Sequence, residues 1–101
     1  MTPPQDPGFE VSISGAVRES LVRLHDEAER NGQRDAFIAG LRTISTRLRT
    51  DPISFGEEVF DLPTLQLTVK VAIVLPVVVE FAVYPDRRLV FVHTFRYVPP
   101  G

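Results

Sequence analysis

The chain lacks the residues on which much enzyme chemistry depends. Its 101 residues include no cysteine, so disulfides, thiolate nucleophiles and thiolate metal ligands are excluded. The two histidines form no HxH or HxxxH pair, and no GxSxG, P-loop or GxGxxG motif occurs. The adjacent acids Glu57 and Glu58 are predicted to be solvated in a loop. We therefore expect no metal and no cofactor, and the sequence gives no support to a hydrolase or a nucleotide-binding protein.

An excess of positive charge is also missing. Lysine and arginine number 11 against 13 aspartates and glutamates, and the resulting net charge of −2 argues against a uniformly basic nucleic-acid binder. Hydrophobic residues make up 44% and charged residues 24%, which is typical of a globular protein, and the length indicates one domain. The amino terminus, MTPPQDPGFE, has neither the basic start nor the apolar stretch of a secretory signal. We therefore expect a cytoplasmic protein.

A strongly apolar stretch, VKVAIVLPVVVEFAVY at residues 69–84, is too short and too interrupted for a membrane helix. A helix needs roughly 20 apolar residues to span a bilayer, and this stretch contains Lys70, Pro76 and Glu80. Most of its side chains are β-branched, which favours strands, and proline is tolerated at a turn. The stretch predicts two buried strands with a turn near Pro76, and no membrane contact.

The first half of the chain predicts a strand followed by two helices. Residues 1–8 contain three prolines and are interpreted as a flexible lead-in, and the alternation FEVSI over residues 9–13 predicts a strand. The first helix should begin after the N-cap Ser14 and end at the Asn31-Gly32 pair. Apolar residues recur at helical spacing in this helix and in a second one over residues 34–49: Val17, Leu21, Leu24 and Ala28, then Phe37, Leu41, Ile44 and Leu48.

The second half predicts three more strands. The segment DPISFGEEVFDLP, residues 51–63, has the turn residues of an irregular connection. Strands are predicted over residues 65–71, 77–84 and 89–97. The order β-α-α-β-β-β predicts an α+β fold of two layers, in which the helical hairpin packs on one face of a small, mainly antiparallel sheet. A single domain over residues 9–98 accounts for the chain.

The alternation along each strand predicts which side chains meet the helices. In the strand 65–71 we expect Leu65, Leu67 and Val69 to pack on the stripe of the second helix, which leaves Lys70 on the polar face. In the next strand the side chains predicted to face the helices are Val77, Val79, Phe81 and Val83.

A second apolar face is left over by this assignment. Val78 and Ala82 point away from the helices, with Val90 or Val92 as further candidates. An apolar face of this kind predicts a cover, either a partner protein or a second copy of the chain. The register of the last hairpin stays open, because an even loop length places Glu80 opposite His93 and an odd one places it opposite Val92.

Three stretches give the chain a family resemblance. They are FEVSISGAVRESLVRL, LRTDPISFGEEVFDLP and VVVEFAVYPDRRLVFVHTFRY. Together with the order of elements, they resemble the RelE/ParE toxin superfamily of bacterial type II toxin–antitoxin modules, over Phe9 to Tyr97. In that family, RelE-like members cleave messenger RNA in the ribosomal A site, ParE-like members inhibit DNA gyrase, and an antitoxin wraps and neutralises both. The resemblance implies the same fold and a cognate antitoxin as partner.

The resemblance also implies a catalytic set for ribosome-dependent messenger RNA cleavage. Lys70 would replace a basic residue of the family's second strand, and Arg96 would match one near the end of the last strand, with His93 or Tyr97 as proton donor. Cations and proton donors around a phosphodiester stabilise the charge that develops on it. Val78 stands where a second basic residue of the family falls, so the implied set is depleted and the activity weakened or altered.

Each of these residues also has an ordinary structural interpretation. Lys70 would pair with Glu80 across the hairpin, His93 would pack or be solvated, and Arg96 and Tyr97 would form an exposed strand end. Two hypotheses therefore stand beside the nuclease. One is a toxin-fold protein that acts only by protein contact, as a gyrase inhibitor or an antitoxin-binding relic; the other is a small α+β dimerisation module unrelated to toxins.

Overall fold

The computed structural model describes residues 8–100. They form two helices, five strands and two short 3₁₀ turns: β1 (Glu10–Ile13), α1 (Gly15–Arg30), α2 (Arg34–Thr50), β2 (Glu57–Leu62), η1 (Pro63–Leu65), β3 (Leu67–Val74), β4 (Val77–Tyr84), η2 (Pro85–Arg87) and β5 (Leu89–Tyr97). Of the predicted lead-in, residues 1–8, only Gly8 is among the described residues.

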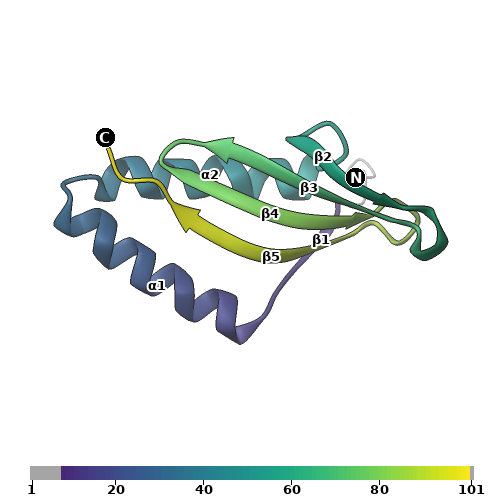
Figure 1. Ribbon diagram of the computed structural model, residues 1–101, viewed down its shortest axis with the longest axis horizontal. Coiled ribbons are helices and arrows are strands. Elements are labelled where there is room, and N and C mark those ends of the chain that lie inside the picture. Colours follow the sequence, from purple (N-terminus) through teal and green to yellow (C-terminus); the bar gives the residue numbers. More distant parts are fainter. Residues whose placement is uncertain (1–7, 101) are drawn as a thin grey trace, which may run out of the picture.

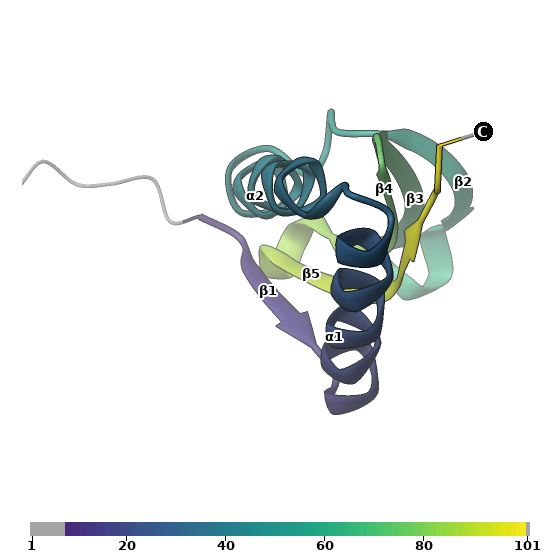
Figure 2. The ribbon, with the colours of Figure 1, turned by 90° about the vertical axis from the view of Figure 1, so that its left-hand side faces the viewer.

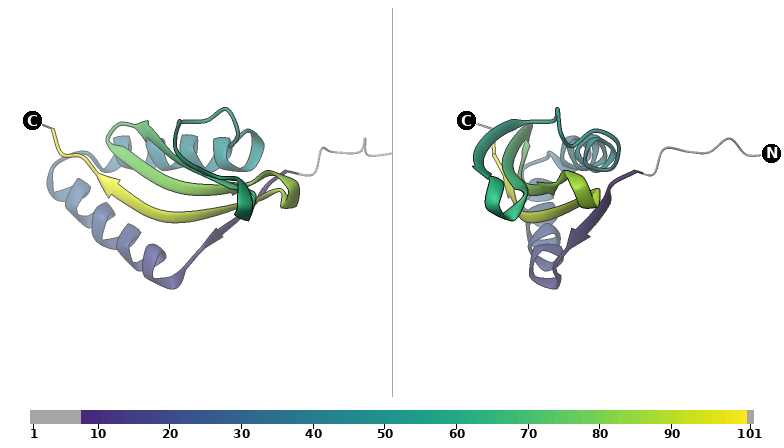
Figure 3. Two further views of the ribbon diagram at one scale, coloured as in Figure 1. Left: turned by 45° about the vertical axis from the view of Figure 1, so that its right-hand side comes forward. Right: turned by 90° about the vertical axis from the view of Figure 1, so that its right-hand side faces the viewer.

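The strands form one mixed sheet in the order β1-β5-β4-β3-β2. β1 pairs with β5 in parallel, and the other neighbours are antiparallel. Both helices lie on the same side of the sheet, so that within residues 8–100 the other side has no helix over it (Figure 1, Figure 3). The predicted two-layer α+β fold is confirmed, with the first strand at an edge. We call the helix side the covered face and the other side the open face.

The helices begin and end where the sequence signals predict. Ser14 caps α1, since its Oγ accepts a hydrogen bond from the Val17 amide at 3.2 Å. After α1, Gly32 adopts a φ of +72°, a conformation that glycine tolerates best. α2 ends at Thr50, two residues before Pro52. The two helices then run in clearly different directions (Figure 2). Among residues 8–100, no helix has the length and apolar character needed to cross a membrane.

The main core lies between the helices and the covered face. Phe37, Ile44 and Leu48 of the predicted α2 stripe are buried, and Leu41 is partly buried beside them. The sheet contributes the following side chains to the same core: Val11, Ile13, Ala72, Val74, Val77, Val79, Phe81, Val83, Val90, Val92, Phe95 and Tyr97. The helical spacing therefore identified the inward face of α2 correctly.

The predicted inward face of β3 is wrong. Leu67 and Val69 belong to a separate cluster on the open face, and Leu65 lies exposed in the turn before the strand. Ala72 and Val74 pack in the core in their place. Apolar side chains occupy both faces of this strand, so its alternation leaves the inward side undecided.

A β-bulge sets the pairing register of the last hairpin. Glu80 pairs with Thr94, and the next pair skips His93, which is the extra residue of a β-bulge. The register is thus neither of the two that the sequence left open. Val90 and Val92, both candidates for the open face, are fully buried in the covered core.

The edge strand β2 was not predicted. Residues 57–62 were expected within an irregular connection, yet they pair antiparallel with β3. Every residue of this strand is exposed, and a bulge at Val59 breaks the pairing register. An exposed, bulged edge strand lacks the apolar period of two by which a strand is recognised.

Candidate functional site

Lys70 is a buried structural lysine in this fold. It lies on the covered face, with only 7% of its surface exposed. Its Nζ donates hydrogen bonds to the carbonyl oxygens of Pro52, at 3.4 Å, and of Ile53. In the sheet it lies opposite Glu58 and Phe81. The predicted polar-face position and the predicted pairing with Glu80 are both wrong, because β3 presents its even-numbered residues to the helix side.

The loop that Lys70 holds is the DPISFG segment. The Phe55 ring packs on the Phe81 ring, with centroids 6.0 Å apart and an interplanar angle of 22°. The guanidinium carbon of Arg47 lies 4.8 Å from the centroid of the same Phe55 ring. Gly56 adopts a φ of +78°, and a Cβ there would lie 2.5 Å from the Val71 carbonyl oxygen. This segment therefore closes the end of the core and positions β2.

The electrostatics around Lys70 have two opposing parts. Burial lowers the pKa of the Lys70 ammonium, while the carboxylates of Glu58 and Asp51 act to raise it. A small cavity of about 100 Å³ adjoins the amine, lined by Ile53, Glu58, Thr68, Lys70, Val83 and Pro85. That space holds a few water-sized groups, far less than the roughly 300 Å³ or more of a typical small-molecule pocket.

His93 lies on the opposite face of the sheet. Its Nδ1 is 3.6 Å from Glu80 Oε1, and both side chains are more than a third exposed. The ring also makes an edge contact with Phe91, with centroids 5.6 Å apart. The bulge in β5 presents His93 beside Glu80 on the open face, where a covering molecule would meet both.

The remaining two candidates, Arg96 and Tyr97, lie on opposite faces of the sheet at the end of β5. Arg96 is exposed and lies opposite Val78, on the open face. Tyr97 is buried on the covered side, where its hydroxyl donates to Gln33 Oε1 and accepts from Asn31 Nδ2 at 3.2 Å. Tyr97 thus ties the helical turn to the sheet.

The structure brings only two of the four predicted site residues to one face. His93 and Arg96 share the open face, whereas Lys70 and Tyr97 are buried on the covered face and committed to hydrogen bonds. A single phosphodiester on the open face would meet His93 and Arg96 without the other two.

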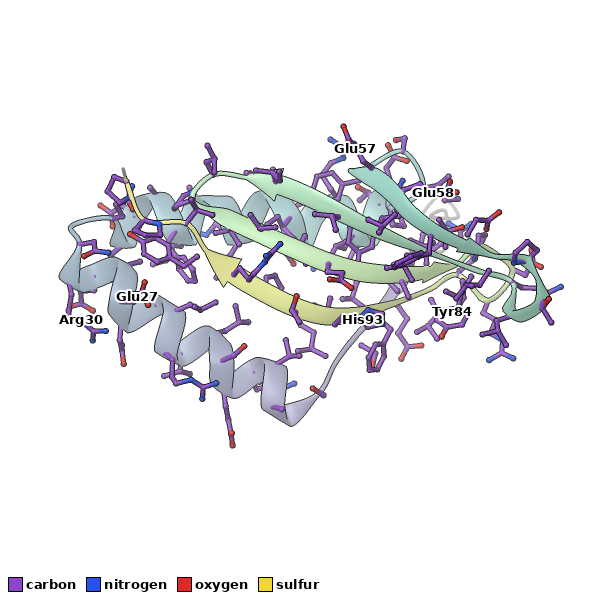
Figure 4. All side chains as sticks on the ribbon, in the orientation of Figure 1. Glu27, Arg30, Glu57, Glu58, Tyr84 and His93 are labelled. Atoms are coloured by element: carbon purple, nitrogen blue, oxygen red, sulfur yellow. The ribbon has the colours of Figure 1, made fainter. Side chains whose placement is uncertain are left out.

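The open face carries two apolar rows across the sheet. Residues that pair on neighbouring strands share a face. One row is Phe91, Ala82, Val69 and Phe60, from β5 to β2. The next row is Leu89, Tyr84, Leu67 and Leu62. Beside them runs a row that is largely polar, Thr94, Glu80, Val71 and Glu57; Figure 4 labels Tyr84, His93 and Glu57 on these strands.

Several apolar side chains of the open face remain accessible to solvent. In the rows, Phe60 is 59% exposed, Leu62 41% and Phe91 37%, and Ile73, which lies opposite Val78 on the same face, is 65% exposed. The alternation of β4 predicted Val78 and Ala82 on this face, but the aromatic residues Phe91 and Phe60 were not predicted there. The alternation of β5 would have indicated Phe91, whereas Phe60 lies in the strand that was not predicted.

One further cluster has the residue types of a metal site. His25, Asp26 and Glu29 of α1 offer ligand atoms that lie within 4.8 Å of one another. His25 Nδ1 is 3.4 Å from Asp26 Oδ1, and its ring makes an edge contact with Phe37. Both acids are exposed on the helix surface, and exposed groups of this kind are common without a metal.

Comparison with known proteins adds no family assignment. No protein-family model, no curated protein and no solved structure matches this chain.

Proposed function

We propose that this protein is a RelE/ParE-like toxin-fold protein of a toxin–antitoxin pair that acts by contact with another protein, in the cytoplasm, and that a cognate antitoxin neutralises it. The observation that carries the proposal is the open face of the sheet. No helix lies over its apolar rows within residues 8–100. Ala82, Val69 and Leu67 at the centre of the rows are buried, whereas Phe91, Phe60 and Leu62 are more than a third exposed, and exposed apolar patches bounded by polar groups usually mark an interaction surface. The resemblance of the sequence supplies the class of partner.

The placement of the basic residues supports contact over cleavage. Lys70 uses its ammonium to hold two loop carbonyls on the covered face, so it is not available to a phosphate on the open face. Val78, which stands where the family has a further cation, is an apolar residue beside Arg96. DNA gyrase is the contact target that the resemblance to ParE implies.

A specific observation favours messenger RNA cleavage as a second candidate. His93 and Arg96 lie on the same face of β5, and Glu80 lies 3.6 Å from the His93 ring. In a ribosome-bound message, His93 could serve as proton donor while Arg96 stabilised charge on the phosphate. This arrangement requires only the open face.

Induced expression in a bacterial host tests both candidates. For the contact mechanism we expect growth arrest with ribosome-bound messages intact, relief by co-expression of the antitoxin encoded next to the gene, and retention of arrest in Arg96→Ala and His93→Ala. Phe91→Asp should abolish arrest, while Val22→Asp, at an exposed position of α1, should not.

Two outcomes would contradict the contact mechanism. Messages cleaved on ribosomes in the wild type, with cleavage lost in Arg96→Ala, would establish the nuclease instead. No growth arrest together with no antitoxin binding would leave the α+β dimerisation module as the remaining hypothesis.

A further inference from the structure

The open face is close in size to a specific protein interface. The five strands contain 4, 6, 8, 8 and 9 residues, and at roughly 3.3 Å per residue and about 4.8 Å between strands they give a sheet plane of about 550 Å². Standard protein–protein interfaces bury roughly 600–1,000 Å² on each partner, so the sheet plane by itself lies just below that range. Phe60, Phe91 and Ile73 would supply most of the apolar area that is still exposed.

Charge is distributed unevenly across this face. His93 and Arg96 lie at its β5 side, and Glu57 lies at its β2 side (Figure 4). Glu80, between them, is already paired with His93. From β5 to β2 the face therefore carries Arg96 on one side and Glu57 on the other. Among residues 8–100, β1 adds Glu10 beyond β5, opposite Leu89 at the other end of the apolar rows.

We propose that the open face is the interface of a symmetric homodimer, whose two-fold axis runs parallel to the strands between β3 and β4. This axis places β5 of one copy over β2 of the other, twice. Two sheets packed face to face with aligned strands form an ordinary sandwich, about 10 Å apart. The inference concerns the chain by itself and does not require the proposed function; a target protein that binds the open face would displace the second copy.

The position of the axis follows from complementarity. With this axis Thr94 and the neighbouring His93 face Glu57 of the second copy, Arg96 lies one row further along the strand from that carboxylate, and the reverse contact repeats this arrangement. Phe91 then faces Phe60 of the second copy, so apolar rows meet apolar rows. An axis perpendicular to the strands through the Phe91 row would instead lay the polar row of one copy over the Leu89 row of the other, and buried charges without partners are costly.

Sedimentation of the purified full chain over a range of concentrations is the first test. The wild type should form a dimer, and Phe91→Asp and Phe60→Asp should each raise its dissociation constant about tenfold or more, since a charge would enter an apolar contact. The matched control is Val22→Asp on α1, which should leave the dimer unchanged. Circular dichroism establishes that each variant is folded.

A charge exchange tests the orientation. Glu57→Arg and Arg96→Glu should each weaken the dimer, because like charges then face each other in both contacts. Mixing the two variants should restore the dimer, since the heterodimer has opposite charges in both contacts. This rescue does not depend on the effect of a charge in the apolar rows.

Three outcomes would overturn the inference. The first is a wild type that is still monomeric at about 0.1 mM, far above the dissociation constants of stable complexes. The second is a dimer that responds to Val22→Asp and ignores Phe91→Asp. The third is a mixture of the exchanged variants that stays monomeric. None of these uses growth or antitoxin binding, so failure here is distinct from failure of the proposed function.

Discussion

The two faces of the sheet use similar side chains and reach different degrees of burial. On the covered face, Phe81 has no exposed surface and packs on Phe55. On the open face, Phe60 remains 59% exposed, although it pairs with the buried Val69. The difference arises from the second layer: the helices and the DPISFG segment close the covered side. A large apolar side chain is therefore a core residue on the covered face and, where it is exposed on the open face as Phe60 is, an interface candidate.

The largest expected effect comes from making the same substitution, phenylalanine to alanine, on each face. Phe81→Ala should destabilise the monomer by about 3–5 kcal/mol, because it removes a fully buried ring and leaves a cavity. Phe60→Ala should cost below about 1 kcal/mol at low protein concentration, since its ring is more than half exposed. Denaturant unfolding at two protein concentrations measures both, and a loss at Phe60 that grows with concentration would indicate the dimer. Equal losses at low concentration would mean that the faces do not differ as described.

A glycine at the end of the core should show the next largest effect. Gly56→Ala would place a Cβ 2.5 Å from the Val71 carbonyl oxygen at a φ of +78°. We expect a loss of about 2–3 kcal/mol, since both the clash and the backbone conformation oppose a side chain. Gly15→Ala, where a Cβ meets nothing within 4 Å, is the control and should be neutral or slightly stabilising. Thermal unfolding compares the two, and hydrogen exchange in β2 should rise only for Gly56→Ala.

Lys70 tests the covered face in another way, because it is a charged residue buried there. Lys70→Met should cost about 1–2 kcal/mol, since the carbonyls of Pro52 and Ile53 lose their charged donor. Unfolding followed by denaturant at near-neutral pH measures this loss. A gain in stability would mean that the cost of burying the ammonium exceeds the value of its hydrogen bonds.

The same residue has a pH signature. Burial lowers the pKa of Lys70 below 10.5, so the unfolded state holds this proton more tightly than the folded state. The contribution of Lys70 to stability therefore rises as the pH increases through the folded pKa toward 10.5. The difference in unfolding free energy between wild type and Lys70→Met should widen in that window, and a difference independent of pH would contradict the assignment.

The smallest effect is expected at Asp51, which anchors the loop from the surface. The Ser54 hydroxyl, which donates to the Asp51 carboxylate, is the main cause that lowers the pKa of Asp51 below 3.8, and Arg47 contributes a smaller part. Stability from this carboxylate is present above pH 3.8 and is lost as the pH falls through the folded pKa. Asp51→Asn should therefore shrink the acid-induced loss of stability slightly, which a pH series of thermal melts would measure. An unchanged acid limb would contradict this role.

Most of the fold follows from local signals that the sequence carries. Ser14, the Asn31-Gly32 pair and the stripe through Phe37, Ile44 and Leu48 define both helices, because caps and helical spacing act within one element. The strands over 77–84 and 89–97 also follow from their own composition. The strand β2 was not predicted, because it is exposed and bulged at the edge of the sheet and therefore lacks a regular apolar alternation.

The candidate site was less accessible to sequence reasoning. Lys70, His93, Arg96 and Tyr97 were grouped by resemblance, and the structure divides them between two faces. A shift of one residue in the pairing register moves a side chain to the opposite face of the sheet, and a single β-bulge produces such a shift within a strand. Residue types and approximate positions were available from the sequence, whereas their grouping required the register.

Local signals along the chain were enough to define the class of the molecule: an α+β chain with two helices, an apolar hairpin at the centre of its sheet and more apolar strand surface than two helices can cover. The pairing of the strands was needed to establish which apolar side chains are covered, that Lys70 is a buried anchor, and that His93 and Arg96 share the open face. The two kinds of feature differ in their range along the chain. Caps, turns and periodicity depend on neighbours a few residues apart, while the face of a strand residue depends on pairing between segments that are distant in the chain.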